Sequence, residues 1–382
     1  MNRIVDRAGQ VEKILSRVPI SKPLLDDRDI NRVVEVLKSG NLAQGERVRE
    51  FEKRFAVYLG VKYAVAVVNG TAALDLALRV IGIREGDEVI TTPFTFIATA
   101  NCVLYQGGRP IFVDIDGKTF NINPELIEKR VGKRTKAIVP VHLFGNPADM
   151  DSIMQIARDK SLFVIEDAAQ AHGATIGSKK VGTFGDLSVF SFYATKNMTT
   201  GEGGMITTNN ADFAARLGLL RDHGQERRYE HIMLGYNLMM TDIQAAIGIG
   251  QLERLEEMNA KRISNANYLS SHLSEISHII TPYTKKGYRH VFHQYALLVD
   301  LGFPVSRDSV LHALVEHGIG ARPCYPKPIY AQPLYRDMGY ADHCPVTEQV
   351  IPQMLQLPIH PSVSRENLEE MVSVIKDCAR TN

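Results

Sequence analysis

One lysine of the chain occupies a position where an amine could do chemistry. Lys196 lies in the segment 189–208, VFSFYATKNMTTGEGGMITT, between two short apolar runs that are expected to form strands. An amine held rigidly there and partly removed from water would be neutral, and it could attack a carbonyl carbon. Most lysines lie on solvated turns, and that is the alternative for Lys196 taken alone. The residues expected around it decide between the two interpretations.

A carboxylate is expected at the end of another strand. Asp167 closes the apolar run 162–167, and the carboxyl ends of strands are where open α/β sheets bind ligands. A buried carboxylate is costly unless it meets a cation or hydrogen bonds. The protonated ring nitrogen of pyridoxal phosphate is such a cation, because an acidic partner keeps that ring an electron sink. The alternative is that Asp167 only caps the turn that follows.

A third group of residues could hold a phosphate. The segment 69–73, NGTAA, falls between a predicted strand and a predicted helix. Gly70 allows a tight turn, Thr71 can cap the helix, and the exposed backbone N–H groups can face an anion. An ordinary capped turn is the alternative. The hydroxyl of Ser191 could add to such a cradle, and together with the aspartate and the lysine it would suit one cofactor, pyridoxal phosphate.

A regular alternation of strands and helices is expected to position these residues. Apolar strands that are each followed by a helix are typical of a mainly parallel sheet buried on both faces. The expected strands are 64–68, 88–92, 110–114, 137–143, 162–167, 189–192 and 205–208, and the expected helices among them are 71–81, 95–105, 124–131 and 150–160.

The length of 382 residues favours two domains. We expect an N-terminal arm at 1–23, a large domain at 24–257 that carries the sheet, and a smaller C-terminal α+β domain at 258–382. The boundary is placed where a predicted helix, 241–258, ends and the pattern changes to another long helix. The fold class is therefore α/β.

Composition excludes several classes of function. A net charge of +1 without a basic run gives no reason to expect nucleic acid. No apolar run reaches the roughly 20 residues of a membrane span, and the N-terminus lacks the apolar core of a signal peptide. Four widely spaced cysteines predict reduced thiols in the cytoplasm, without a disulfide framework or zinc site.

His290 and His293 are spaced HxxH, not HExxH, so no metal is expected.

Over residues 20–361 the chain resembles the DegT/DnrJ/StrS family of sugar-nucleotide aminotransferases, which are pyridoxal-phosphate enzymes of fold type I. The motifs that carry the resemblance are NGTAAL, GDEVITTPFTFIATAN, PVHLFG, DMD, VIEDAAQAHGA, SFYATKNMTTGEGGMITTN, RDHG and LGYN.

The resemblance implies roles for individual residues. Lys196 would form the Schiff base with pyridoxal 5'-phosphate, and Asp167 would be the partner of the pyridine nitrogen. Phe96 would stack on the cofactor ring, and Gln170 would contact its other side or the phenolic oxygen. The implied phosphate ligands are Thr71, Ala72, Ser191 and, from a second subunit, Asn237. The last of these implies a homodimer with shared active sites.

Other positions of the resemblance concern the substrate. Tyr325 and His360 match substrate-side positions, with packing as an equal alternative. His142 and His172 fall in site motifs, where each could contact the sugar or cofactor or be a structural imidazole. One residue departs from the family: Met239 stands where an arginine usually follows the GYN segment, which puts in doubt whatever contact that arginine makes.

The implied activity is transfer of an amino group from a donor, L-glutamate in the family, to a nucleotide-linked keto sugar. SFYATKNMTTGEGG and LGYN are closer to members that act at C4 of 4-keto-6-deoxy sugars than to those that act at C3 of a keto sugar or on a keto-cyclitol. A pyridoxal-dependent dehydratase would carry histidine in place of Lys196. A nicotinamide enzyme would need GxGxxG, and a non-catalytic regulator would need an interaction surface such as a basic helix-turn-helix; neither is found.

Overall fold

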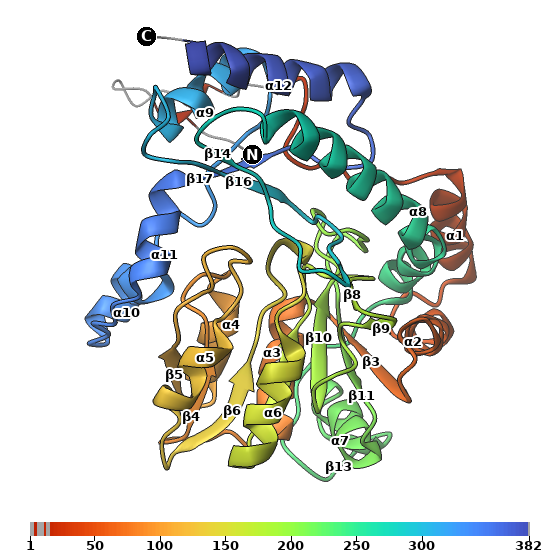
Figure 1. The fold of residues 1–382 in the computed structure, drawn as a ribbon. Coiled ribbons are helices and arrows are strands. Elements are labelled where there is room, and N and C mark those ends of the chain that lie inside the picture. The colour runs from red at the N-terminus through yellow and green to blue at the C-terminus, as the bar shows by residue number, and fades with distance from the viewer. Residues whose placement is uncertain (1–3, 6–10, 13–15, 381–382) are drawn as a thin grey trace.

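A seven-stranded sheet lies at the centre of the computed structural model, which describes residues 4–5, 11–12 and 16–380 (Figure 1). In their order across the sheet, the strands are β3 (Tyr63–Val67), β11 (Gly204–Thr208), β10 (Leu187–Ser191), β7 (Phe163–Asp167), β6 (Thr135–Val139), β4 (Glu88–Thr91) and β5 (Arg109–Phe112). Strand β11 is antiparallel to both of its neighbours, and the other pairs are parallel. The expected mainly parallel sheet is confirmed.

Helices bury both faces of this sheet. Successive side chains of a strand point to opposite faces, so Val189 of β10 faces one layer of helices and Phe190 faces the other. The first layer consists of α3 (Gly70–Val80), α4 (Ala98–Tyr105) and α7 (Ala211–Arg221). The second consists of α2 (Glu46–Leu59), α5 (Pro124–Ile127), α6 (Met150–Lys160) and the first half of α8 (Asp242–Leu273).

Helix α8 differs from the expected pair of helices. It is one continuous helix of 32 residues, and the expected domain boundary between residues 257 and 258 falls inside it. A capping box between Thr241 and Gln244 begins the helix, and α1 (Asp27–Ser39) and α2 pack along its first half. The division into domains at this residue stays a prediction.

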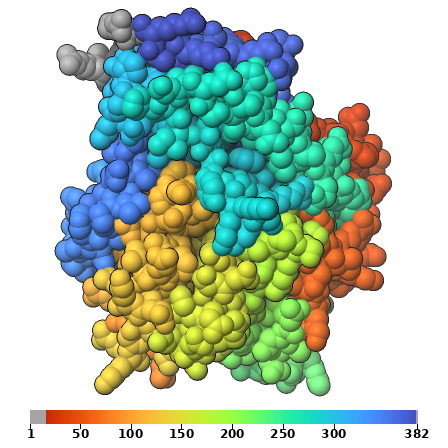
Figure 2. Space-filling model, viewed as in Figure 1, coloured from red at the N-terminus to blue at the C-terminus, as the bar shows by residue number. Residues whose placement is uncertain are grey.

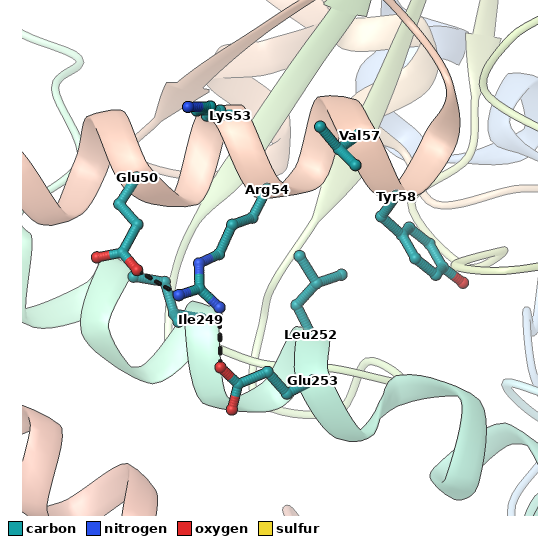
Figure 3. A pocket seen from close by; sticks show the side chains of 8 residues that line it. All are labelled: Glu50, Lys53, Arg54, Val57, Tyr58, Ile249, Leu252 and Glu253. Carbon is teal, nitrogen blue, oxygen red and sulfur yellow. Dashed lines mark hydrogen bonds and ion pairs between the residues drawn. The ribbon is translucent and has the colours of Figure 1, made fainter.

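The contact between α2 and α8 is visible at the surface. Arg54 forms ion pairs with Glu50 at 2.7 Å and with Glu253 at 2.9 Å, above the apolar side chains of Ile249 and Leu252 (Figure 3). The shallow hollow in Figure 3 is lined by none of the predicted site residues.

The C-terminal part has a core of its own. An antiparallel sheet of β14 (Ile279–Ile280), β16 (Tyr295–Val299) and β17 (Met354–Leu357) packs against α9 (Arg307–Glu316), α12 (Arg365–Arg380) and the second half of α8. Val18 forms a β-bridge with Ile319, so the described end of the N-terminal arm lies on this part. The other elements are β1 (Ile4–Val5), β2 (Val11–Glu12), β8 (Thr175–Ile176), β9 (Lys179–Lys180), β12 (Gln225–Arg227), β13 (Glu230–His231), β15 (Tyr288–Arg289), α10 (Pro333–Asp337), α11 (Pro345–Val350), and the 3₁₀ turns η1 (Glu128–Arg130), η2 (Leu143–Gly145), η3 (Ile329–Ala331) and η4 (Ile351–Gln353).

The two parts are joined by more than α8. Strand β15 pairs with β8, which brings residues that follow α8 down onto the large domain (Figures 1 and 2). On the other side, the carboxylate of Asp114 accepts backbone hydrogen bonds from Val346 at 2.8 Å and Thr347 at 3.0 Å. Within the described ranges, the structure contains no helix that is both long and apolar enough to cross a membrane.

Candidate active site

Strand register places Asp167 and Ser191 on the same face of the sheet. In the parallel pair of β7 and β10, Asp167 lies opposite Val189, and Ser191 is two residues further along. Both side chains therefore point toward the layer of α3 and α4, at the carboxyl ends of their strands. The sequence-based expectation that these residues share one sheet edge agrees with this arrangement.

Asp167 is buried, and its carboxylate is held from two sides. The hydroxyl of Thr99 on α4 donates to Oδ2 at 2.8 Å, and the backbone N–H of Ala169 donates to Oδ1 at 3.2 Å. Burial raises the pKa of Asp167, whereas the Thr99 hydrogen bond and the charge of Lys196 oppose the rise. The hydrogen bond from Ala169 shows that Asp167 also caps the turn that follows β7, which was its alternative role. This bond occupies Oδ1 and Thr99 occupies Oδ2, and because each carboxylate oxygen has two lone pairs, the group can still accept from a cation.

Lys196 follows the end of β10 and is half-buried. Its backbone N–H donates to Tyr193 O at 2.9 Å, which makes a turn of the chain after the strand. Removal from water lowers the pKa of Lys196 from 10.5 to about 8; the charge of Asp167 opposes this and that of Arg322 adds to it. A lysine with such a pKa is partly neutral near neutrality, as a nucleophile toward a carbonyl must be.

The first turn of α3 lies against Ser191. A methyl group added to Gly70 would come within 2.7 Å of Ser191 Cβ, so only glycine fits there. The expected capping role of Thr71 is wrong: Asn69 is the N-cap, and its Oδ1 accepts from the backbone N–H of Ala72 at 2.8 Å. Thr71 is already inside the helix, where a hydroxyl can no longer reach the N–H groups of the first turn. The N–H groups of Gly70 and Thr71 precede any intrahelical acceptor and can receive an anion.

Phe96 and Gln170 lie on the segments that follow β4 and β7. Phe96 lies two residues before α4 and is 58% exposed, so its side chain is open to a ligand. Gln170 accepts from the backbone N–H of Phe144 at 2.7 Å and donates to Tyr325 Oη at 3.1 Å. Tyr325, which is 155 residues away in sequence, is thereby brought beside Gln170.

The histidines lie apart from the Asp167 face. His142 is fully buried: its Nδ1 accepts from the N–H of Ala148, so Nε2 donates to Glu166 at 3.1 Å. His172 is enclosed between Phe190 and Phe192, on the opposite face of β10 from Ser191. A direct contact of His172 with substrate stays a prediction.

Two further predicted residues lie outside this cluster of contacts. His360 is buried in the C-terminal part, with Nε2 3.1 Å from Pro19 O in the N-terminal arm. Asn237 is exposed and forms a β-bridge with Asp222. Met239, where the family usually has arginine, forms a β-bridge with Val67 and so continues the edge of the sheet beside β3. A role for His360 and Asn237 in binding also stays a prediction.

Sequence analysis missed several residues that shape this region. Thr99 gave no signal of its own, because its partner Asp167 lies 68 residues away in sequence. Asn69 is among the most favoured N-cap residues and could have been preferred over Thr71. Asn197 and Arg322 gave no local signal, because their neighbours are distant in sequence.

The residues gathered at this sheet edge fit pyridoxal phosphate. The glycine-lined first turn of α3 suits a phosphate, the buried carboxylate of Asp167 suits a protonated ring nitrogen, and the amine of Lys196 suits an aldehyde. Within the described ranges, no group of three or more histidine, cysteine, aspartate or glutamate side chains could hold a metal ion.

Comparisons with known proteins show which enzymes the whole chain resembles. The chain is 41% identical to the GDP-perosamine synthase of Caulobacter vibrioides, over 94% of this chain and 98% of that protein. It is 40% identical to the spore coat polysaccharide biosynthesis protein SpsC of Bacillus subtilis, over 97% and 99% of the two chains. The solved structure of PseC of Helicobacter pylori, an aminotransferase of pseudoaminic acid biosynthesis, superposes with a TM-score of 0.91 at 31% identity, over 95% and 99% of the two chains.

The match to a family is equally extensive. Residues 23–376 match the DegT/DnrJ/EryC1/StrS aminotransferase family, and the structural neighbours share the α/β aminotransferase fold of type I. The chain therefore belongs to the DegT/DnrJ/EryC1/StrS aminotransferase family.

Proposed function

We propose that the protein transfers the amino group of L-glutamate to a nucleotide-linked 4-keto-6-deoxyhexose, with pyridoxal 5'-phosphate joined to Lys196 as its cofactor. Membership in this aminotransferase family implies the cofactor. The observation that carries the proposal is the arrangement at one sheet edge of a lysine with lowered pKa, a buried carboxylate and a glycine-lined helix N-terminus.

Pyridoxal phosphate, when bound, supplies an aldehyde that receives amino groups and a ring that delocalises electrons. Lys196 would hold the cofactor through its amine and, once released, would carry a proton to and from the carbon next to the nitrogen. Asp167 would keep the ring nitrogen protonated, and Thr99 would hold the carboxylate in place. Gln170 and Tyr325 would fix the ring from the side of the C-terminal part.

The substrate class is supported by the relatives. A synthase named for GDP-perosamine is 41% identical over nearly the whole chain, which favours a nucleotide-linked sugar as the acceptor. The motifs SFYATKNMTTGEGG and LGYN favour amination at C4. Amination at C3 is the alternative within the same class.

A homodimer with shared sites is part of the proposal. Asn237 is exposed, and apolar side chains near it in the sequence are exposed as well: Tyr229, Ile232 and Leu234. Exposed apolar side chains so close together favour burial against a second subunit, from which Asn237 would reach the phosphate. We also propose the cytoplasm as the compartment, because all four cysteines are free thiols.

The test is a set of nucleotide-linked keto sugars incubated with glutamate, with release of 2-oxoglutarate as the readout. Turnover of at least one 4-keto-6-deoxyhexose nucleotide is expected, and NMR of the product should show nitrogen at C4. Nitrogen at C3 would correct the position, and a deoxygenated sugar without nitrogen would indicate a dehydratase. Lys196→Ala should abolish turnover, and Lys196→Arg, which keeps the charge but cannot act as the amine, should also be inactive. No turnover with any sugar and no binding of the cofactor would favour a regulator.

A further inference from the structure

A buried polar network lies directly behind Lys196, on the side of α8. Asn197 is 2% exposed, and its Nδ2 donates to Asn259 Oδ1 at 2.8 Å and to Val291 O at 3.1 Å. Its Oδ1 lies 3.2 Å from Nδ1 of His293. These contacts join the residue after the lysine to α8 and to the chain that leads into the C-terminal sheet.

The chemistry of the partners fixes the orientation of every group in this network. A backbone carbonyl only accepts, so the amide nitrogen of Asn197 must face Val291 O, and its oxygen must face His293. Nδ1 of His293 must then carry the proton. Burial lowers the pKa of His293 well below its ordinary value, and the charges of Lys196 and Arg262 add to this, so the ring is neutral. The network is therefore fully specified and does not change its protonation near neutral pH.

The same network reaches the loop that follows Asp167. Asn259 accepts from Asn197 and donates from Nδ2 to His172 O at 2.8 Å. His172 is two residues after Gln170, so one asparagine of α8 ties together the lysine segment and the segment that carries two predicted cofactor contacts. Arg262, one turn further along α8, donates to the carbonyls of Phe292 at 3.5 Å and His293 at 3.4 Å.

We propose that Asn197 is a positioning residue for Lys196. One planar peptide joins the Cα atoms of Lys196 and Asn197, and the peptide before it is held by the hydrogen bond from the backbone N–H of Lys196 to Tyr193 O. The side chain of Asn197 holds the far end of the joining peptide against α8. The direction of the amine is therefore set by the contacts of Asn197 with Asn259, Val291 and His293. The role of the amine itself rests on the function proposed above.

Loss of the Asn197 amide would release this restraint. Asn259 Oδ1, Val291 O and the Nδ1–H of His293 would lose their partner, and buried polar groups recover such a loss by admitting water. Water beside Lys196 would weaken the desolvation that holds its pKa near 8. The other groups that act on the pKa of Lys196 would remain: Asp167 from β7, and Arg322 and Cys324 from the chain after residue 321. The buried rings of His172 and His293 also face this charge but are themselves neutral.

The first test measures the pKa of Lys196 in the cofactor-free protein, from the pH dependence of its acetylation followed by mass spectrometry of the Lys196 peptide. Asn197→Ala should raise this pKa by about one unit or more toward 10.5. Asn121→Ala is the matched control, because Asn121 is also a buried asparagine whose side chain both donates and accepts, bonding Leu143 N at 2.9 Å and Asn146 O at 3.0 Å. It should lower the melting temperature without moving the lysine pKa.

The second test follows the cofactor-loaded enzyme. Asn197→Ala should lower kcat about tenfold and leave KM within about twofold, because the amine acts in the chemical step and not in sugar binding. Asn259→Ala removes the partner of Asn197 on α8, and it should likewise raise the lysine pKa and lower kcat. It therefore tests the proposal even if Asn197→Ala does not fold. Unchanged lysine pKa in both variants would overturn the proposal. The acetylation readout needs neither cofactor nor substrate, so a missing sugar turnover would refute the proposed function alone.

Discussion

Thr99 Oγ1 lies 2.8 Å from Asp167 Oδ2, so α4 holds the carboxylate at the edge of the sheet. Thr95 Oγ1, in the segment before α4, lies 3.2 Å from Thr99 Oγ1 and gives the hydroxyl a second neighbour. A hydroxyl that donates to a buried carboxylate both orients it and keeps its pKa from rising further. This contact links α4, which begins two residues after Phe96, to the residue expected to meet the cofactor ring.

Thr99→Val should therefore weaken the enzyme without disturbing the fold. A hydrogen bond to a charged group is worth about 1.5–3 kcal/mol, and its loss should raise the pKa of Asp167 and lower kcat by roughly tenfold or more. Steady-state kinetics across pH 5–8 would measure this. Thr99→Ser restores the hydroxyl and should recover most of the rate; equal losses in the two variants would contradict the role of the hydroxyl.

Gly70→Ala should selectively impair cofactor binding. The added methyl group would meet Ser191 Cβ at 2.7 Å, and relief of that clash must shift the first turn of α3. Titration of the cofactor-free protein with pyridoxal phosphate, followed by absorbance, should show at least about tenfold weaker binding. Gly218→Ala is the control, because outside the adjoining residues and backbone of α7 nothing lies within 4 Å of the new methyl group. It should be neutral, or stabilising by about 0.5–1 kcal/mol.

Asn69→Ala removes the cap of the same helix. Loss of a cap costs about 0.5–2 kcal/mol, and here it also frees the turn that would hold the phosphate. We expect a lower melting temperature together with weaker cofactor binding. Asn210→Ala removes the cap of α7, where Asn210 accepts from Asp212 N and Phe213 N. That variant should lose comparable stability and keep its cofactor affinity. If both variants lost cofactor affinity equally, the loss would follow from lower stability and not from the first turn of α3.

The lowered pKa of Lys196 predicts a pH-dependent stability of the cofactor-free protein. The folded lysine titrates at about 8 and the unfolded one near 10.5, so between these values the unfolded chain binds more protons. The free energy of unfolding of the wild type, relative to Lys196→Met, should therefore rise as the pH increases from 8 to 10.5. Urea denaturation at a series of pH values would show this. A difference that stays constant with pH would mean that the amine is fully hydrated in the folded state.

Subunit mixing tests the predicted contribution of Asn237 to a second site. Lys196→Ala and Asn237→Ala homodimers should each be inactive or nearly so. Random mixing of the two variants makes half of all dimers mixed. If the asparagine acts across the interface, each mixed dimer has one intact site of its two, so about a quarter of the wild-type activity should return. If it acts within its own subunit, no mixed dimer has an intact site, and mixing would recover nothing.

The sheet and its site edge were predictable because the signals for them are local. Apolar strands alternate with helices, and Asp167 and Ser191 each end such a strand, which places both at the carboxyl edge. The hydrogen bonds of that edge were not predictable. Thr99 lies 68 residues from Asp167, and Tyr325 lies 155 residues from Gln170, so only tertiary structure brings them together.

The continuity of α8 was missed for a related physical reason. Asn259, Arg262 and Asn265 interrupt the apolar pattern, yet all three are buried. Their side chains donate to backbone carbonyls of residues far away in sequence, including His172 O and His360 O. A polar residue inside an amphipathic pattern indicates a break unless its partner is known, and the sequence does not show the partner.

The length of α8 limits how this protein can be dissected. At 1.5 Å per residue its 32 residues form a rod of about 48 Å, anchored at one end among α1 and α2 and at the other in the C-terminal core. A cut after residue 257 would split this rod, leave broken hydrogen bonds on both fragments, and separate Asn259 from Asn197. Fragments meant to fold alone should be divided elsewhere, and complementation between two co-expressed halves cut at that point should fail.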